Sequence, residues 1–395
     1  MTLRTFGSFC VAFAAGLLVT VNAFSEESHN LRFGAAMVAL IFIHTLMRWR
    51  LWISRELLFY VAFATYNGLS LLWTSNVRDG IPTVQLTVNF VFISVLFSAL
   101  IVFHDRRAVL QGVLGGFLVG AVVYTRTSGY PLSYPEDFSY NTIAGMYLFG
   151  LLMTALYGWH QRSRILPISL GMVLVLLIGA TTSIKTNLGM LLGAVAASLM
   201  SLRYALRAIA RNAILGIAFV GVLAYAVTSN QDLMDRVQGG YTRVSMGADV
   251  LAAREDKTGG AGLGKRESWA QVGLKGWITN PVFGEGVESF RGDFNYTSHS
   301  TVIDLLYNTG LIGFVLFYSM FVSIAWRLFQ ARGSPARSPR ALVFGVLTCY
   351  AFISLSGTMY YDVFLAAALA ISEALVSRPE GTAAVASGAA ARARS

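Results

Sequence analysis

One histidine, His299, stands where a base could act on a substrate. It lies in the segment YTSHSTVIDLL, where a long polar stretch gives way to an apolar run. The other four histidines lie in a short polar turn, within an apolar run or beside arginines. Imidazole is the side chain whose ordinary pKa suits proton abstraction near neutral pH. A histidine that only hydrogen-bonds a helix end at an interface is the alternative.

A second unusual residue is Lys185, in the turn ATTSIKTNLGMLL between two apolar runs. A cation near membrane depth is costly unless it faces a cavity or a partner. A lysine whose stem follows the apolar surface while its ammonium reaches water is an equally good explanation. Asp304 and Asp362 are further charges at the edges of apolar runs, and either could pair with a neighbouring cation.

These residues belong to a chain that consists largely of apolar runs. Of its 395 residues 55% are hydrophobic and 13% are charged, against about 25% charged residues in soluble domains. The composition predicts an all-α polytopic integral membrane protein and excludes soluble enzymes, disordered binders and disulfide-stapled modules. Cys10 and Cys349 both lie in apolar runs, so we expect neither a disulfide framework nor a cysteine metal site.

Apolar windows long enough to cross a bilayer of about 30 Å predict about twelve transmembrane helices. No small-residue cleavage site follows the first window, so it is interpreted as a retained helix rather than a signal peptide. The windows are 6–24, 31–47, 56–73, 81–103, 108–124, 142–158, 165–182, 187–202, 213–228, 301–325, 341–357 and 360–376.

The short loops give the orientation. Arginines such as Arg203, Arg207 and Arg211 gather on the side of the N-terminus, which predicts that both termini are cytoplasmic. The net charge of +10 then reflects orientation and attraction to anionic lipid, not a nucleic-acid partner. The predicted organisation is nine helices in 1–228, a large outer loop in 229–300, three helices in 301–376 and a disordered cytoplasmic tail in 377–395.

The outer loop is far longer than ordinary connections, which favours a functional role. Arg266 lies where a predicted helix begins, and the NPVFGEG segment that follows this helix predicts a compact turn. The helix is predicted to be amphipathic and to lie at the membrane surface, because apolar residues recur at near-helical spacing: Trp269, Val272, Leu274 and Trp277.

Metal binding is the weaker interpretation of the acids in this loop. Glu285, Glu288 and Asp293 lie close together in the sequence and could hold a divalent ion, but this spacing is common in solvated loops. The chain also contains no P-loop, no HExxH and no GxSxG pattern. We therefore expect no metal and no cofactor.

Taken together, these motifs resemble the O-antigen ligase and Wzy-type polymerase superfamily, whose members have a polytopic fold of the GT-C type. The similar features are twelve spans, a large late outer loop, SIKTNLG before a span, and one stretch from Arg266 to Phe314. Within that stretch the residues that match are Arg266, Trp269, Pro281, Gly284, Gly286, His299, Ser300, Gly310 and Gly313. The motifs cover about 60 residues, and the remainder matches in architecture only.

The resemblance implies a metal-independent, inverting glycosyltransferase at the periplasmic face of a bacterial inner membrane. Such enzymes transfer a glycan from an undecaprenyl-diphosphate carrier to an acceptor hydroxyl. The resemblance gives His299 the role of base and Arg266 a role on the donor diphosphate. Lys185 stands where ligases usually carry arginine, and ammonium and guanidinium bind phosphate differently. The Ser-x-Lys-Thr sequence around it looks closer to exopolysaccharide and O-antigen polymerases.

Other residues are expected to line the same site. Arg291 would add a third cation, and Trp269 and Tyr296 could stack on sugars, although interfacial anchoring is the default for such aromatic residues. Asn141 and Arg126 lie in outer segments that could face the same cavity.

Three functions remain open from the sequence. The first is a polymerase that extends O-antigen or exopolysaccharide repeat units, with a possible chain-length regulator as partner. The second is a ligase that joins the finished glycan to a lipid A core. The third is a transporter or flippase for the same lipid-linked glycan, which would need no catalytic residue.

Overall fold

The computed structural model describes residues 2–22, 30–48, 52–128, 140–161, 165–180, 184–201, 263–330, 340–355, 357–360 and 362–377. Within these ranges the chain is helical and contains no strand. The helices are α1 (Leu3–Asn22), α2 (Asn30–Arg48), α3 (Arg55–Ser70), α4 (Val77–Phe103), α5 (Arg106–Ser128), α6 (Tyr140–Trp159), α7 (Ile165–Ala180), α8 (Ile184–Ser201), α12 (Leu263–Thr279), α13 (Ser289–Phe294), α14 (Thr301–Gln330), α15 (Arg340–Ser354) and α16 (Val363–Ser377).

The prediction of an all-helical chain with membrane-length helices is confirmed. Among the described residues, four helical segments are long and apolar enough to cross a membrane: Thr5–Asn22, Val77–Phe103, Arg106–Tyr124 and Thr301–Gln330. Five further apolar helical segments are shorter, at 10–17 residues. Helices overlap eleven of the twelve predicted windows. The ninth window, the first part of the outer loop and nearly all of the predicted tail lie outside the described residues.

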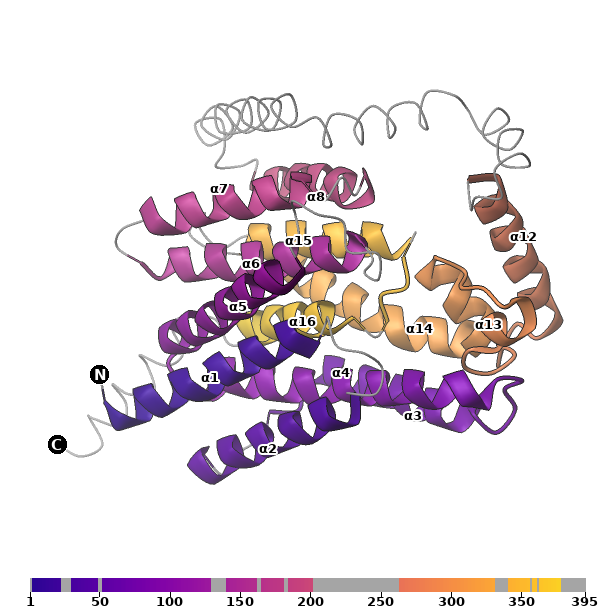
Figure 1. The fold of residues 1–395 in the computed structure, drawn as a ribbon, viewed down its shortest axis with the longest axis horizontal. Helices are drawn as coiled ribbons and strands as arrows, with labels where there is room; N and C mark the ends of the chain where they lie inside the picture. The colour runs from indigo at the N-terminus through magenta and orange to yellow at the C-terminus, as the bar shows by residue number, and fades with distance from the viewer. Residues whose placement is uncertain are drawn as a thin grey trace.

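The long helices run roughly side by side, and one end of this bundle differs from the other (Figure 1). At the end away from the N-terminus, α12, α13 and the first turn of α14 lie close to the turn between α3 and α4. We call this the loop end. It carries most of the residues predicted to do chemistry.

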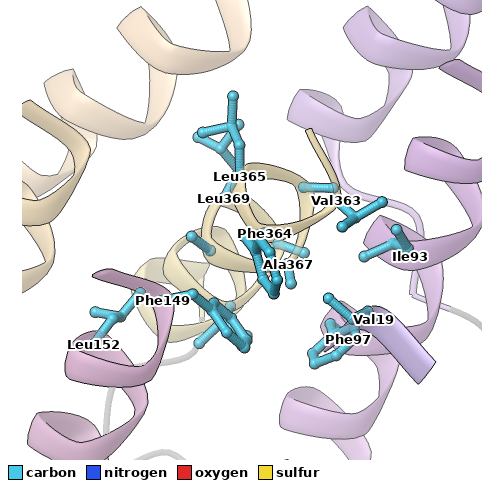
Figure 2. Close-up of a cluster of buried hydrophobic side chains, with 14 of the residues drawn as sticks. Val19, Ile93, Phe97, Phe149, Leu152, Val363, Phe364, Leu365, Ala367 and Leu369 are labelled. Carbon is cyan, nitrogen blue, oxygen red and sulfur yellow. The ribbon is translucent and has the colours of Figure 1, made fainter. Parts of the chain in front are cut away.

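The core of the bundle lies around α16. Figure 2 shows Phe364 of α16 close to Phe149 of α6 and near Phe97 of α4, and the rings of Phe149 and Phe364 have centroids 5.8 Å apart. Residues 366–368 are alanines with no exposed surface, so neighbouring helices can approach α16 closely. The buried position of α16 explains why its first half is apolar on all sides.

Two helix pairs meet at glycines. On α5, Gly112, Gly116 and Gly120 recur every four residues and face α1. A Cβ atom on Gly116 would lie 2.0 Å from the carbonyl oxygen of Phe13, so the two backbones are in direct contact. Gly193 of α8 approaches the backbone of α15 in the same way. Small residues at such crossings are typical of helix packing in membranes, where apolar burial gives little driving force.

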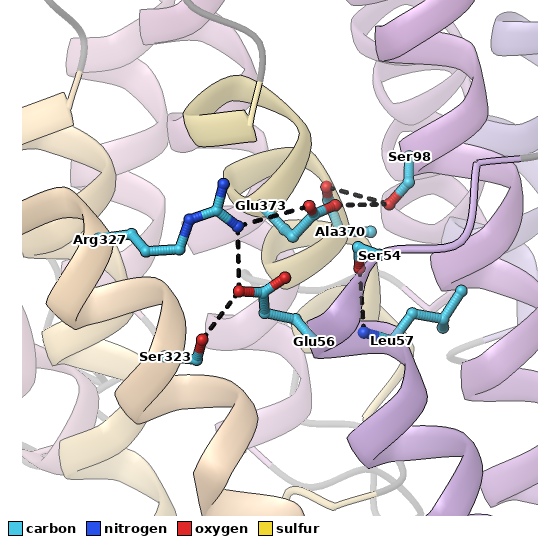
Figure 3. Close-up of polar contacts among 8 residues, drawn as sticks. All are labelled: Ser54, Glu56, Leu57, Ser98, Ser323, Arg327, Ala370 and Glu373. Carbon is cyan, nitrogen blue, oxygen red and sulfur yellow. Dashed lines mark hydrogen bonds and ion pairs between the residues drawn. The ribbon is translucent and has the colours of Figure 1, made fainter.

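Figure 3 shows a polar cluster with residues from four helices. It lies at the start of α3 and near the end of α14, which is the end of the bundle opposite the loop end. Arg327 of α14 donates to Glu56 of α3 at 3.0 Å and lies 3.9 Å from Glu373 of α16. Ser323 also donates to Glu56, and Ser98 of α4 donates to Glu373. Both carboxylates are almost fully buried, so these bonds compensate the cost of removing the charges from water.

Replacing Gly116 with alanine is expected to destabilise the protein by about 1–3 kcal/mol, because the new methyl group meets backbone atoms that cannot rotate away. The measurement is thermal unfolding in detergent. Gly171→Ala in α7 is the matched control, since its Cβ would make only an ordinary 3.7 Å contact with Leu151. Equal melting temperatures for the two variants would contradict the packing described for α1 and α5.

Candidate functional site

The loop end is organised by a break in α14. Gly310 has φ +62° and ψ −163°, which no helix contains. The break exposes the carbonyl groups of Tyr307 and Asn308, and these accept backbone N–H groups of Glu285 and Gly286, both at 2.8 Å. Irregular backbone at membrane depth is tolerated only where other protein groups satisfy it. The break therefore creates a docking place for residues 281–286, which we call the motif turn.

Bonds in the opposite direction complete the docking. Beyond the break, the N–H groups of Leu311 and Ile312 donate to the carbonyl groups of Pro281 and Val282, at 2.9 and 3.3 Å. Four backbone hydrogen bonds thus replace those that α14 loses at Gly310. The motif turn is held as firmly as a piece of secondary structure.

The glycines of the motif are required by this contact. Gly284 and Gly286 have φ of +70° and +98°, values that glycine adopts without strain. A Cβ atom on Gly284 would lie 2.5 Å from the backbone nitrogen of Gly310, and one on Gly310 would lie 2.4 Å from the carbonyl oxygen of Val282. Gly284 and Gly310 are therefore needed because two segments of the chain are in direct backbone contact there.

The turn between α3 and α4 holds the loop from the other side. The Thr74 hydroxyl donates to the carbonyl group of Val287 at 2.6 Å, and the N–H of Val287 donates to the Ser70 hydroxyl at 3.1 Å. Ser75 donates to the Asp293 carboxylate at 2.9 Å. Nothing in the sequence linked these segments, which lie more than 200 residues apart. The polar run TSNVRD, placed between two apolar helices, was the only available signal.

His299 lies in a tight turn, Thr297 to Thr301, which we call the histidine turn. Its φ of +54° is left-handed, a conformation that costs a non-glycine residue about 1 kcal/mol or more. The imidazole is half-buried, its Nδ1 lies 3.4 Å from the Thr297 hydroxyl, and the ring of Tyr296 meets it edge-on at 5.1 Å. The predicted base and the predicted aromatic residue are therefore neighbours.

Arg291 belongs to the same end of the bundle. Its Nε lies 3.6 Å from the Asp79 carboxylate at the start of α4, and both side chains are partly exposed, at 46% and 35%. Exposed ion pairs contribute at most about 1 kcal/mol. An anionic ligand could therefore replace Asp79 as the partner of this guanidinium at small cost.

Lys185 lies in the first turn of α8 and is half-buried. Gly189 packs on Cys349 and Gly193 on Gly345, so α8 and α15 run antiparallel. The same register places Lys185 level with Ile353, at the end of α15 that leads to residues 357–360. Those residues bond directly to the histidine turn, since the N–H and hydroxyl of Thr301 donate to the Gly357 carbonyl at 3.1 and 2.6 Å. Lys185 and His299 therefore lie at the same end of the bundle.

The other predicted site residues are placed by their helices alone. Arg266 and Trp269 lie in α12, Arg126 in the last turn of α5 and Asn141 in the first turn of α6. A helix is present where the aromatic spacing predicts one: it is α12, which ends just before Pro281. Its amphipathic position at a membrane surface stays a prediction. The side chains of these four residues lie outside the described part of the chain.

The acidic residues of the loop bind hydroxyl groups. Glu285 accepts from Thr279 at 3.2 Å, Glu288 from Thr83 at 2.8 Å, and Asp293 from both Ser75 and Tyr307. In the described ranges no three His, Cys, Asp or Glu side chains are grouped to hold a metal ion. In this structure the three carboxylates serve to fasten the loop.

Asp304 and Asp362, at the edges of apolar runs, accept hydrogen bonds from hydroxyl and N–H groups in place of the cation pairing considered from the sequence. Asp304 accepts hydroxyl groups from Ser298 at 3.0 Å and Tyr360 at 2.7 Å. Asp362 accepts the N–H of Leu365 at 2.8 Å and so caps the start of α16. The sequence gives no sign of the Asp304–Tyr360 bond, because the two residues are distant in the chain.

Comparison with known proteins adds no assignment: no family model matches the chain, and no curated protein matches it in sequence. The resemblance to O-antigen ligases and polymerases therefore rests on the motif residues themselves.

Gly310→Ala is expected to release the motif turn, because alanine at φ +62° is strained and its methyl group collides with the Val282 carbonyl. Limited proteolysis in detergent should then cleave the chain between residues 280 and 300 much faster than in the wild type. Gly68→Ala in α3 is the control, since its Cβ lies 3.9 Å from Val84. Equal cleavage rates in wild type and Gly310→Ala would rule out the docking as a stabilising contact.

The stability of the protein should also depend on pH, through the Glu288 carboxyl group in the loop. Burial and the nearby Asp304 carboxylate raise the pKa of Glu288 from its ordinary 4.5 to about 7. Between these values the folded state holds a proton that the unfolded state has released, so stability falls as the pH rises from about 4.5 to about 7.

Glu288→Gln keeps an oxygen for the Thr83 hydroxyl and removes the charge. We expect it to flatten this pH dependence and to stabilise the protein at pH 8 by at most about 3 kcal/mol. Unfolding measured at several pH values tests this, with Glu285→Gln as a control for the loss of a carboxylate in the same turn. A wild-type pH profile in Glu288→Gln would refute the assignment.

Proposed function

We propose that the protein is a glycosyltransferase of the O-antigen ligase and Wzy-type polymerase kind. It transfers a glycan from an undecaprenyl-diphosphate carrier to an acceptor hydroxyl, and its best-supported reaction is polymerisation of O-antigen or exopolysaccharide repeat units. The observation that carries this proposal is the convergence of distant residues: the histidine turn, Arg291 and the first turn of α8 lie at one end of an apolar helical bundle.

In this reaction the leaving group is a lipid diphosphate whose negative charge grows as the glycosidic bond breaks. Fixed cations near that diphosphate stabilise the transition state more than the ground state. Arg291, Lys185 and Arg266 are the proposed cations. The weak, partly exposed pairing of Arg291 with Asp79 suits a residue that must exchange its partner for phosphate.

The acceptor sugar hydroxyl is a poor nucleophile until its proton begins to leave. His299 is the proposed base, and a base in this role contributes about 10² to 10⁴ in rate. Direct attack by the activated hydroxyl on the anomeric carbon inverts its configuration. The left-handed backbone of His299 supports this role, because strained residues persist where the surrounding structure holds them and are common at active sites.

The finer topology belongs to the same proposal. We propose about twelve transmembrane helices in a bacterial inner membrane, with both termini in the cytoplasm and the loop end facing the periplasm. The arginine distribution in the short loops supports this orientation. The polar cluster around Arg327 would then lie at the cytoplasmic end of the bundle.

The test is complementation of a gene deletion in the native host, together with a transfer assay on purified protein. We expect His299→Ala and His299→Asn to lose at least 10²-fold in transfer activity while still folding and inserting. Asn is included because it tolerates left-handed backbone better than Ala does. His160→Ala, at the end of α6, is the matched control and should keep full activity.

The glycans of the deletion strain separate the three functions. Single repeat units on the acceptor without long chains would support a polymerase. Long polymer retained on the lipid carrier would support a ligase. Full complementation by both His299 variants would rule out His299 as the base. If the purified wild-type protein then also showed no glycan transfer, the transporter interpretation would be favoured.

A further inference from the structure

The histidine turn is braced by a buried carboxylate that the mechanism above does not use. Asp304 lies one helical turn into α14 and is 6% exposed. Its Oδ1 accepts the Ser298 hydroxyl at 3.0 Å, and its Oδ2 accepts the Tyr360 hydroxyl at 2.7 Å. Because each carboxylate oxygen takes one hydroxyl, Asp304 joins the residue before His299 to the segment that precedes α16.

Ser298 transmits this contact to the backbone of the turn. Its hydroxyl oxygen accepts the N–H of Ser300 at 3.3 Å and lies 3.0 Å from the Ser300 carbonyl oxygen. These contacts span His299 itself, whose φ of +54° needs such support. Without the Asp304 bond, only the two contacts with Ser300 would hold the Ser298 hydroxyl, and the left-handed turn would lose this link to α14.

Tyr360 is itself held in place by hydrogen bonds to its backbone and to the residue before it. Its carbonyl group accepts the hydroxyl of Tyr60 in α3, and the neighbouring N–H of Met359 donates to the Thr301 hydroxyl at 2.8 Å. Tyr360 and Ser298 are both at least nine-tenths buried. The series of hydrogen bonds from Tyr60 through Tyr360 and Asp304 to Ser298 is therefore continuous and buried.

We propose that Asp304 is a positioning residue, which acts through Ser298 to fix the direction in which His299 presents its imidazole. This inference rests on the function proposed above. A buried acid is costly where a neutral side chain could fill the space, and here its two acceptor oxygens orient two hydroxyl groups that converge on one turn. A displacement of about 1 Å at a reacting group can cost about 10² in rate.

The test uses Asp304→Asn, which keeps the shape of the side chain but leaves one acceptor oxygen for two hydroxyl groups. We expect a 10- to 100-fold fall in kcat with KM for the lipid-linked donor within twofold of wild type. Tyr360→Phe and Ser298→Ala should show smaller losses of the same kind. Asp293→Asn is the matched control, because Asp293 also accepts one serine and one tyrosine hydroxyl but has no bond to the histidine turn.

A second measurement separates positioning from a merely structural role. In a His299→Gly variant, glycine suits the left-handed backbone and free imidazole is supplied in the buffer. Imidazole that is not attached to the turn does not depend on Asp304. Adding Asp304→Asn to this background should therefore change the rescued activity by less than twofold.

Each outcome has one meaning. An equal fall of the rescued and the wild-type activities on Asp304→Asn would overturn the positioning role, as would full activity of Asp304→Asn in the wild-type background. Where imidazole does not restore activity, the kcat and KM values decide: a loss carried by KM, or matched by Asp293→Asn, overturns the proposal. Full activity of both His299→Ala and His299→Asn would instead refute the proposed base, and absence of any glycan transfer by the wild-type protein would refute the proposed function.

Discussion

The structure of the loop end depends on the break in α14 at Gly310. A helix at membrane depth normally satisfies its own backbone, and here four backbone groups are satisfied by the motif turn instead. This exchange anchors the loop before it reaches the histidine turn. It also explains why glycine is needed on both sides of the contact, since a side chain at Gly284 or Gly310 would push the motif turn and α14 apart.

From this anchor the loop is held on three sides. Hydroxyl and amide groups of the α3–α4 turn bind its backbone, the broken helix binds the motif turn, and residues 357–360 bind the histidine turn. Nearly all of these contacts are short hydrogen bonds between buried or half-buried groups. For the transfer reaction proposed above, such pre-organisation would be favourable, because fixed groups need no reorganisation when charge develops.

The rest of the bundle is held together by other kinds of interaction. The glycine contacts of α1 with α5 and of α8 with α15 bring backbones together, and the buried ion cluster around Arg327 joins four helices at the other end. Backbone contact stabilises an apolar bundle where apolar burial contributes little. The ion cluster satisfies its buried charges with partners from four different helices.

The sequence by itself determined the helical class, the approximate bounds of the apolar helices and the residues of the motif, but not α13 or the break in α14. These features are local: apolar runs set helix length, and Pro281 with two glycines predicts a turn wherever it occurs. Only the tertiary structure decided which segment the turn docks on, that Asp304 binds Ser298 and Tyr360 instead of a cation, and that the α3–α4 turn belongs to the same end as His299. The Asp304–Tyr360 bond joins residues 56 positions apart, and the Thr74–Val287 bond joins residues 213 positions apart. Such long-range hydrogen bonds leave no periodic pattern in the sequence, because the chain between the partners can have any length. Their partners are selected when the helices pack.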